Sequence, residues 1–232
     1  MKEKICGGIK MEYYGEKPKK FTKEWWPYFW DYYKWHTIAI IFVVVSVVWT
    51  AVDIITQEKY DGSLVTVGEV VLTDELSDEL KKNVSVAVDD IDGNGTKSVL
   101  VEQLAFSDND VDVQYSSAMK MKYELKLQTD ESFAFIMDKT QLERSLSSPD
   151  TQGCFATVTE WLTEDINKED MFEYDKKPYA VSLKNSKLFK DMGLNGENVY
   201  AVLRYNYKSD KEELNSQFEN AKKILNALLK SE

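Results

Sequence analysis

Apolar residues gather in one long run near the start of the chain. Residues 38–52 carry no charge over fifteen consecutive positions, and the run reaches about 21 residues when positions 35–55 are included. A helix rises about 1.5 Å per residue, so a segment of this length crosses a hydrocarbon core of about 30 Å. The pattern predicts one transmembrane helix at residues 36–56, preceded by a basic and aromatic juxtamembrane segment at residues 1–35.

The residues flanking this run indicate its orientation. Lys59 is the only basic residue soon after it, whereas several lysines precede it: Lys17, Lys19, Lys20, Lys23 and Lys34. Positively charged flanks stay in the cytoplasm, so we expect a cytoplasmic N-terminus and an extracytoplasmic C-terminal domain in the cell membrane. Nine of the fifteen residues at 21–35 are aromatic, which suits the headgroup layer, and we expect the chain to turn inward at or after Pro27. A cleavable signal peptide is the alternative, but the long N-terminal region and the bulky residues ending the run disfavour it.

Beyond residue 57, short apolar runs alternate with amphipathic stretches. The near-continuous apolar run at 64–72 predicts a strand covered on both faces, and Thr73 then caps a helix with an acidic first turn. A second unit repeats this order with a strand at 99–106, a helix at 112–127 and a strand at 132–137. This alternation predicts a single α/β domain at residues 57–232, with a parallel or mixed sheet and right-handed crossovers.

The rest of the domain gives weaker signals until its end. A short helix is expected at 141–146 and short apolar runs at 179–183 and 199–207, while the stretch 155–174 has no clear pattern. A capping box at 209–212 then opens a last helix. Its apolar residues recur at helical spacing and predict a core face: Leu214, Phe218, Ala221, Leu225 and Leu228.

Charge divides at the same boundary as hydropathy. Residues 1–35 carry eight lysines and five acids, whereas residues 57–232 carry 21 basic and 34 acidic residues, a net charge of −13. So acidic a surface repels phosphate backbones, which argues against a nucleic-acid partner. It suits metal cations, basic peptides or simple solubility. Cys6 and Cys154 fall on opposite sides of the predicted membrane, so we expect an outer domain without a disulfide.

The clearest local motif is the segment 90–96, which fits the first positions of a D-x-D-x-N-G calcium loop. Side-chain oxygens would come from Asp90, Asp92 and Asn94, and a backbone carbonyl from Thr96. The bidentate glutamate expected at position twelve is absent, because Val101 stands there and Glu102 follows one residue late. Two interpretations stay open, a weak calcium site or an Asx-rich turn between helix and strand.

Catalytic groups are scarce because His36, at the edge of the predicted span, is the only histidine. The outer domain therefore cannot form a Ser-His-Asp triad, a Cys-His pair or a histidine-based zinc site. The segment 117–120 matches S-x-x-K and 107–109 matches S-D-N, but their order is reversed relative to penicillin-recognising enzymes. Adjacent carboxylates at 89–90 and 164–165 fit a solvated acidic face better than acid–base catalysis.

Several segments together resemble a group of single-pass membrane proteins of Gram-positive bacteria. Their outer part is similar to a reduced periplasmic-binding-protein (solute-binding) domain. The resemblance rests on residues 30–36, 90–95, 133–138 and 178–183 and on the C-terminal strand and helix, and it covers most of residues 28–232. It implies a binding-type fold but assigns no substrate residues.

We therefore expect a non-catalytic, membrane-anchored binding or accessory module that meets a small ligand or a partner in a membrane complex. The alternatives are an extracytoplasmic hydrolase using carboxylates or a Ser/Lys pair, and a structural subunit of a membrane or envelope complex.

Overall fold

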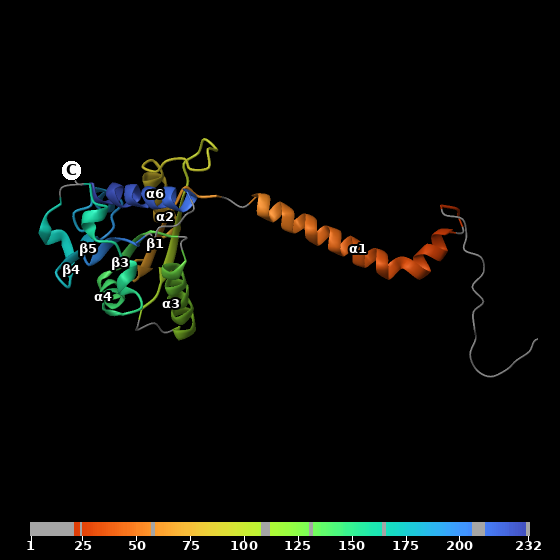
Figure 1. The fold of residues 1–232 in the computed structure, drawn as a ribbon, viewed down its shortest axis with the longest axis horizontal. Coiled ribbons are helices and arrows are strands. Elements are labelled where there is room, and N and C mark those ends of the chain that lie inside the picture. The colour runs from red at the N-terminus through yellow and green to blue at the C-terminus, as the bar shows by residue number, and fades with distance from the viewer. Residues whose placement is uncertain are drawn as a thin grey trace, which may run out of the picture. The chain divides into compact units, whose positions relative to one another are not determined.

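The chain divides into two compact units, Met1–Glu58 and Lys59–Glu232, which are described separately (Figure 1). The computed structural model describes residues 21–23, 25–56, 59–107, 112–129, 132–163, 166–205 and 212–230.

The first unit holds one long helix, α1 (Trp25–Thr56), which contains the predicted membrane span. A stretch of 20 residues, Tyr33–Val52, is long and apolar enough to cross a membrane, and none of it is buried within the structure. Pro27 lies in the first turn, where its missing N–H breaks no helical hydrogen bond. The helix starts before the predicted span and includes the aromatic residues from Trp25 onward, and Figure 1 shows a bend in its N-terminal part.

The second unit contains a six-stranded mixed sheet with the strand order β2-β1-β3-β6-β5-β4. The strands are β1 (Gly62–Gly68), β2 (Val99–Ala105), β3 (Ala134–Asp138), β4 (Met171–Tyr174), β5 (Lys177–Ser182) and β6 (Val199–Leu203). Strand β1 pairs in parallel with β2 and β3, whereas β6 is antiparallel to β3 and β5, and β4 is antiparallel to β5. The predicted α/β class with a mixed sheet is confirmed.

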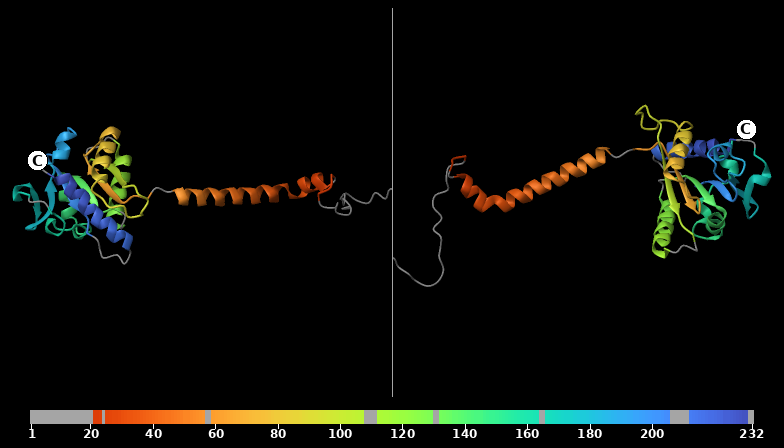
Figure 2. Two further views of the ribbon diagram at one scale, coloured as in Figure 1. Left: turned by 90° about the horizontal axis from the view of Figure 1, so that it is seen from above. Right: turned by 180° about the vertical axis from the view of Figure 1, so that it is seen from behind.

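Helices cover both faces of this sheet. They are α2 (Asp74–Ser85), α3 (Val113–Gln128), α4 (Lys139–Ser147), α5 (Lys187–Asp191) and α6 (Glu212–Leu229), with short 3-10 helices at Gln152–Cys154, Val158–Glu160 and Lys168–Asp170. Helices α2 and α6 lie on one side of the sheet and α3 and α4 on the other (Figures 1 and 2). The domain thus has three layers.

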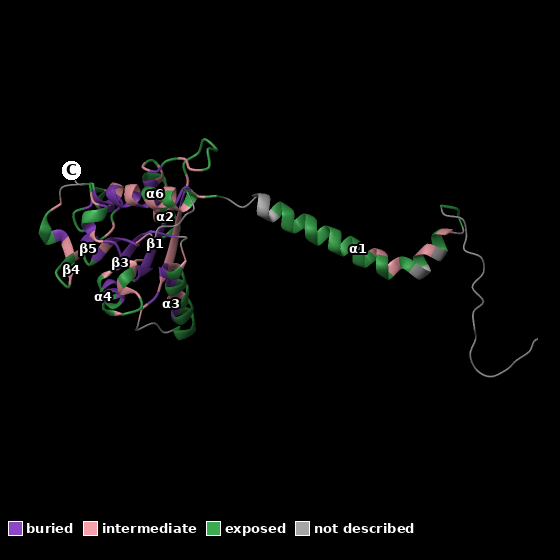
Figure 3. Cartoon of the chain, viewed as in Figure 1, coloured by how far each residue is buried: buried purple, intermediate pink, exposed green. Residues whose placement is uncertain are grey.

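Two apolar clusters fill the spaces between these layers. Leu64 and Ile136 of the central strands face α2 and α6, whereas their neighbours Val65 and Phe135 face α3 and α4, and all four are fully buried. Alternate residues of a strand point to opposite faces, so strands covered on both sides must be apolar throughout. Figure 3 shows the resulting buried sheet between more exposed helices.

Local signals in the sequence place the starts of α2 and α3 correctly, whereas α4 begins two residues before its predicted start at 141. The Thr73 hydroxyl accepts a hydrogen bond from the Leu76 amide (3.3 Å), and the Asp112 carboxylate accepts one from the Tyr115 amide (3.0 Å). Helix α6 begins at Glu212, while residues 209–211 of its predicted capping box lie outside the described residues. Four residues of its predicted apolar stripe, Phe218, Ala221, Leu225 and Leu228, pack into or against the core, so the core face of α6 is confirmed from Phe218 onward.

Candidate functional site

The loop between α2 and β2 holds the predicted calcium ligands. The two carboxylate oxygens of Asp90 accept hydrogen bonds from the backbone amides of Gly93 and Gly95, each at 2.8 Å, and Asp92 accepts one from the Asn94 amide at 3.0 Å. Both glycines adopt positive φ angles of 70° and 82°, which glycine tolerates without steric cost. The segment is therefore a tight turn closed by its own carboxylates.

A third carboxylate, which the sequence motif does not include, comes from Asp61 at the start of β1. One oxygen from each of Asp61, Asp90 and Asp92 lies within 4.8 Å of the others, a spacing that could hold a metal ion. Strands β1 and β2 are parallel with Gly62 opposite Val99, so the residues just before each strand lie side by side at the N-terminal ends of the two strands. Predicting that strand pairing from the two apolar runs would have located Asp61.

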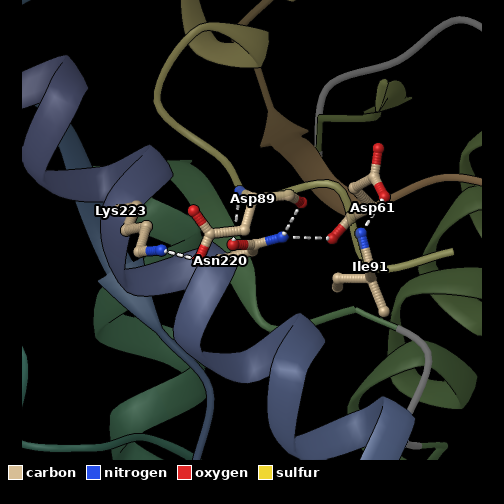
Figure 4. Close-up of polar contacts among 5 residues, drawn as sticks. All are labelled: Asp61, Asp89, Ile91, Asn220 and Lys223. Carbon is tan, nitrogen blue, oxygen red and sulfur yellow. Dashed lines mark hydrogen bonds and ion pairs between the residues drawn. The ribbon is translucent and has the colours of Figure 1, made fainter. Parts of the chain in front are cut away.

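Hydrogen bonds to the backbone hold Asp61 in place. It is 2% exposed, and its two oxygens accept the amides of Ile91 (2.7 Å) and Ser98 (2.8 Å). From α6, the Asn220 side-chain amide donates to the carbonyls of Asp61 (3.0 Å) and Asp89 (2.8 Å), and its oxygen accepts the Asp89 amide (2.9 Å) (Figure 4). The hydrogen bonds of Asn220 thus attach Asp61 and Asp89, on either side of the turn, to α6.

Two acids of this loop, Asp89 and Asp90, favour their charged forms. Hydrogen bonds from backbone amides, the Gly95 amide foremost, hold the pKa of Asp90 below its ordinary value. The Lys223 ammonium, which hydrogen-bonds to Asp89 (Figure 4), lowers the pKa of that carboxyl as well. Both groups therefore stay ionised at neutral pH, and the loop offers anionic oxygens of the kind that calcium prefers.

The remaining positions of the calcium motif have other partners. The Asn94 side-chain oxygen accepts the Thr96 amide at 2.7 Å, and Thr96 itself is exposed. Val101 is half-buried on β2 and packs against the core. Glu102 points to the opposite face, where it pairs with Lys122 (2.5 Å) and Lys126 (2.6 Å) of α3. Neither residue supplies the missing bidentate ligand, so Asp61 is the additional acid at this loop among the described residues.

At the carboxyl ends of the parallel strands, the chain's own side chains and amides bind one another. Asp138 ends β3, and its two oxygens accept the amides of Gln141 in α4 (2.9 Å) and of Glu69 just beyond β1 (2.7 Å). Open α/β sheets commonly bind ligands at the carboxyl ends of such neighbouring strands. Here an internal carboxylate already uses the amides that a bound anion would need.

A polar hollow lies at the same end of the strands, beyond the last residue of β5. Its volume is about 510 Å³. Its lining residues come from the segment before β4, from the end of β5, from α5 and from the end of α6: Ile166, Asn167, Asp170, Ser182, Asn185, Ser186, Lys187, Lys190, Asp191 and Leu229. Two lysines, two aspartates, amides and hydroxyls dominate this surface, which suits a small polar molecule better than an apolar one.

Asp170 is a buried acid in the lining of this hollow. The carboxylate is 7% exposed, accepts the Asn185 side-chain amide at 3.0 Å and pairs with the Lys184 ammonium at 2.6 Å. The hydrogen bond between the Lys184 ammonium and the Asp170 carboxylate raises the pKa of Lys184. A second hollow of about 250 Å³ shares Asp170 and Ser182 with the first and is also lined by Lys184, so Asp170 borders both polar cavities.

Serines near this edge serve structural roles. Ser186 donates its hydroxyl to the Leu228 carbonyl (2.6 Å) and caps α5 by accepting the Phe189 amide (3.2 Å). Ser107 of the S-D-N match donates to Glu69 (2.7 Å). Lys120 of the S-x-x-K match lies over the Phe106 ring, 5.8 Å from its centroid. Ser186, Ser107 and Lys120 thus each have a contact within the domain.

The adjacent carboxylates Asp89 and Asp90 have different partners. Asp89 pairs with Lys223, whereas Asp90 closes the loop. Residues 108–109 and 164–165 lie outside the described residues.

Comparison with known proteins adds no identification. Neither a protein-family model, nor a curated protein, nor a solved structure matches this chain.

Proposed function

We propose that the chain is a single-pass membrane protein whose extracytoplasmic α/β domain binds a small polar ligand or assists a membrane complex, without catalysis of its own. The observation that carries the anchor is the exposed apolar stretch Tyr33–Val52 of α1. Ile40, Phe42 and Val47 of this stretch are each more than half exposed. Burial of apolar surface is worth about 25 cal/mol per Å², so such a helix strongly favours a bilayer over water.

The binding part of the proposal rests on the polar hollow beside α5. Lys187 and Lys190 line it together with Asp191. Unlike Asp170, these three side chains have no hydrogen bond or ion pair to another described side chain. A ligand with both anionic and hydrogen-bonding groups would satisfy them. The proposed similarity to solute-binding domains agrees with a binding role.

Calcium binding at the loop 90–96 is a second proposal, favoured specifically by the position of Asp61. Calcium takes six to eight oxygen ligands. Three carboxylates within 4.8 Å of one another supply part of that set. The affinity expected without a bidentate glutamate lies at about 10⁻⁴ to 10⁻³ M.

Protease protection tests the topology. With epitope tags at both ends, protease added to intact cells should remove the C-terminal tag and spare the N-terminal tag until the membrane is permeabilised. The intact mass of the purified protein distinguishes an anchor from a cleaved signal. Protection of the C-terminal tag in intact cells would overturn the proposal.

Thermal melting of the purified full-length protein tests the hollow. Small carboxylates, phosphates and amino acids are added one class at a time, and a ligand that binds the folded state raises the melting temperature. Lys190→Ala should abolish such a shift, whereas the control Lys82→Ala, at an exposed lysine of α2, should keep it. A shift that survives Lys190→Ala would place the ligand elsewhere.

A further inference from the structure

Aromatic rings run along the N-terminal part of α1. The ring of Trp25 stacks on that of Phe29 with 4.8 Å between their centroids, and Phe29 stacks on Tyr33 at 5.8 Å. Three further tryptophans of this part of the helix are each more than half exposed: Trp26, Trp30 and Trp35. Rings of this kind are enriched where lipid meets water, because they bury their bodies and keep their polar edges wet.

This part of α1 is too long to stand upright in the headgroup layer. The 20 residues of Tyr33–Val52 rise about 30 Å, which is the thickness of the hydrocarbon core. Residues 25–32 of the same helix add about 12 Å, whereas the headgroup layer on one side of a bilayer is only about 5 to 8 Å thick. The bend in the N-terminal part of α1, which Figure 1 shows, lets these residues lie along the membrane surface instead.

The turn just before α1 packs against the helix and carries positive charge. The Trp25 amide donates a hydrogen bond to the Thr22 carbonyl at 3.1 Å, and the Phe21 ring lies 5.2 Å from the Trp25 ring. Lys23, in the same turn, is exposed. The sequence from 17 to 23 holds no acid and four lysines: Lys17, Lys19, Lys20 and Lys23. The contacts of residues 21–23 thus connect a basic run directly to the aromatic part of α1.

Charge complementarity favours anionic phospholipids as the partner of this segment. Clusters of four or more lysines beside a transmembrane helix are typical of segments that bind anionic headgroups. The α/β domain has the opposite charge, since residues 57–232 carry 21 basic and 34 acidic residues, and an anionic leaflet repels it. A preference of the whole chain for anionic lipid would therefore originate on the N-terminal side of the apolar stretch.

We propose that the N-terminal part of α1, together with the lysines of residues 17–23, binds anionic phospholipids. The aromatic rings lie in the headgroup layer along the membrane surface, and the lysine ammonium groups pair with lipid phosphates. This inference rests on the membrane anchor proposed above, but it does not depend on the polar hollow or on calcium.

Tryptophan fluorescence of the full-length protein in lipid nanodiscs tests the preference. The discs contain equal amounts of phosphatidylcholine and phosphatidylglycerol, and only one of the two lipids carries bromine, which quenches tryptophans close to it. Five of the six tryptophans lie in α1, and the sixth, Trp161, is 2% exposed, so quenching reports on α1. Brominated phosphatidylglycerol should quench at least about twofold more strongly than brominated phosphatidylcholine.

Removing the basic run should remove this difference. In the quadruple variant K17Q/K19Q/K20Q/K23Q, the two brominated lipids should quench equally. The matched control K82Q/K97Q/K176Q/K177Q loses the same charge at exposed lysines of the α/β domain and should keep the preference. Salt at about 1 M should also abolish the preference of the natural protein, because the Debye length falls to about 3 Å.

The outcomes separate this inference from the anchor on which it rests. Equal quenching by both lipids in the natural protein, or a preference that survives the quadruple variant, would overturn lipid recognition and leave the anchor in place. Absence of quenching by either lipid would mean that another surface covers the rings, which also overturns it. A chain that fails to enter the discs would overturn the anchor and this inference together.

Discussion

The side chain of Arg204 donates a hydrogen bond from Nε to the carbonyl of Leu127 at 3.0 Å, which ties the end of β6 to the last turn of α3. Arg204 is 1% exposed, also donates to the Ser132 carbonyl at 3.3 Å, and lies 5.2 Å from the centroid of the Phe133 ring. Carbonyls at a helix C-terminus lack helical partners and carry partial negative charge, so a guanidinium is well suited to them. One buried cation thus organises the connection between α3 and β3.

Replacing Arg204 should therefore destabilise the domain. Arg204→Met removes the donors of two buried carbonyls and should lower the free energy of unfolding by roughly 3 kcal/mol. Denaturant titration measures this loss. Lys82→Met is the control, because Lys82 is exposed on α2 and its loss should cost no more than about 0.5 kcal/mol. Similar losses for both variants would contradict this role of Arg204.

Gly68 should tolerate no side chain, because the Asp138 carboxylate occupies the space beside it. A Cβ on Gly68 would lie 1.8 Å from an oxygen of Asp138, and its φ is +88°. Gly193 also has a positive φ, +69°, but nothing lies within 4 Å of its Cβ position. Gly193→Ala should cost about 1 to 2 kcal/mol from backbone strain alone, whereas Gly68→Ala should cost roughly 3 kcal/mol or more.

The comparison of these two glycine variants isolates the contact from the backbone strain. Thermal and denaturant unfolding measure both effects in the same protein. Equal destabilisation would mean that the Asp138 side chain moves aside at little cost, so that the packing of Gly68 against Asp138 contributes little to stability.

The layered core is predictable from the sequence because its signals are local. Alternation of strand and helix, the cap at Thr73 and the stripe on α6 each depend on residues within a few positions of one another. The hairpin of β4 and β5 could not be predicted from the sequence. Its strands are short, and its turn is formed by Asp175 and Lys176, which adopt positive φ angles although neither is glycine.

The candidate sites depend on contacts between distant segments. Asp90 and Asp92 are recognisable as a motif, but Asp61 joins them only through the parallel pairing of β1 and β2. The polar hollow likewise combines residues before β4, on α5 and at the end of α6. Residues so far apart carry no common periodicity, so only the fold reveals their proximity.

The ion pair of Asp89 and Lys223 should make stability depend on acid pH. The pKa of Asp89 lies below its ordinary value of 3.8 when folded, chiefly through the hydrogen bond from Lys223. The pair therefore contributes stability at pH values above 3.8, and this contribution is lost as the pH falls through the folded pKa. The natural protein should therefore be more stable than Asp89→Asn at neutral pH, and the difference between their free energies of unfolding should shrink as the pH is lowered below 3.8.

A double-mutant cycle with Lys223→Met provides the control for that pH dependence. If the two side chains act as a pair, the double variant should lose no more stability than either single variant. Additive losses would assign the pH effect to other neighbours of Asp89.

Calcium should raise the melting temperature through the loop carboxylates. Calcium at about ten times its dissociation constant stabilises the folded state by about 1.4 kcal/mol. Asp92→Asn should remove this shift while leaving the protein folded, because Asp92 is exposed. Asp150→Asn, at an exposed acid between α4 and the following 3-10 helix, should leave the shift intact. Equal responses of both variants would reduce the effect to general screening of an acidic surface.

Charges placed within the apolar stretch of α1 should release the chain from the membrane. Val44 and Val48 lie inside Tyr33–Val52, and each arginine near the middle of a span costs about 2.5 to 3.5 kcal/mol. The double variant Val44→Arg/Val48→Arg should therefore be extracted by alkaline carbonate, whereas the natural protein should not. The control Val71→Arg/Val86→Arg adds the same charges at exposed apolar positions of the α/β domain and should stay in the membrane pellet. Retention of the α1 variant would mean that something other than this stretch holds the protein to the membrane.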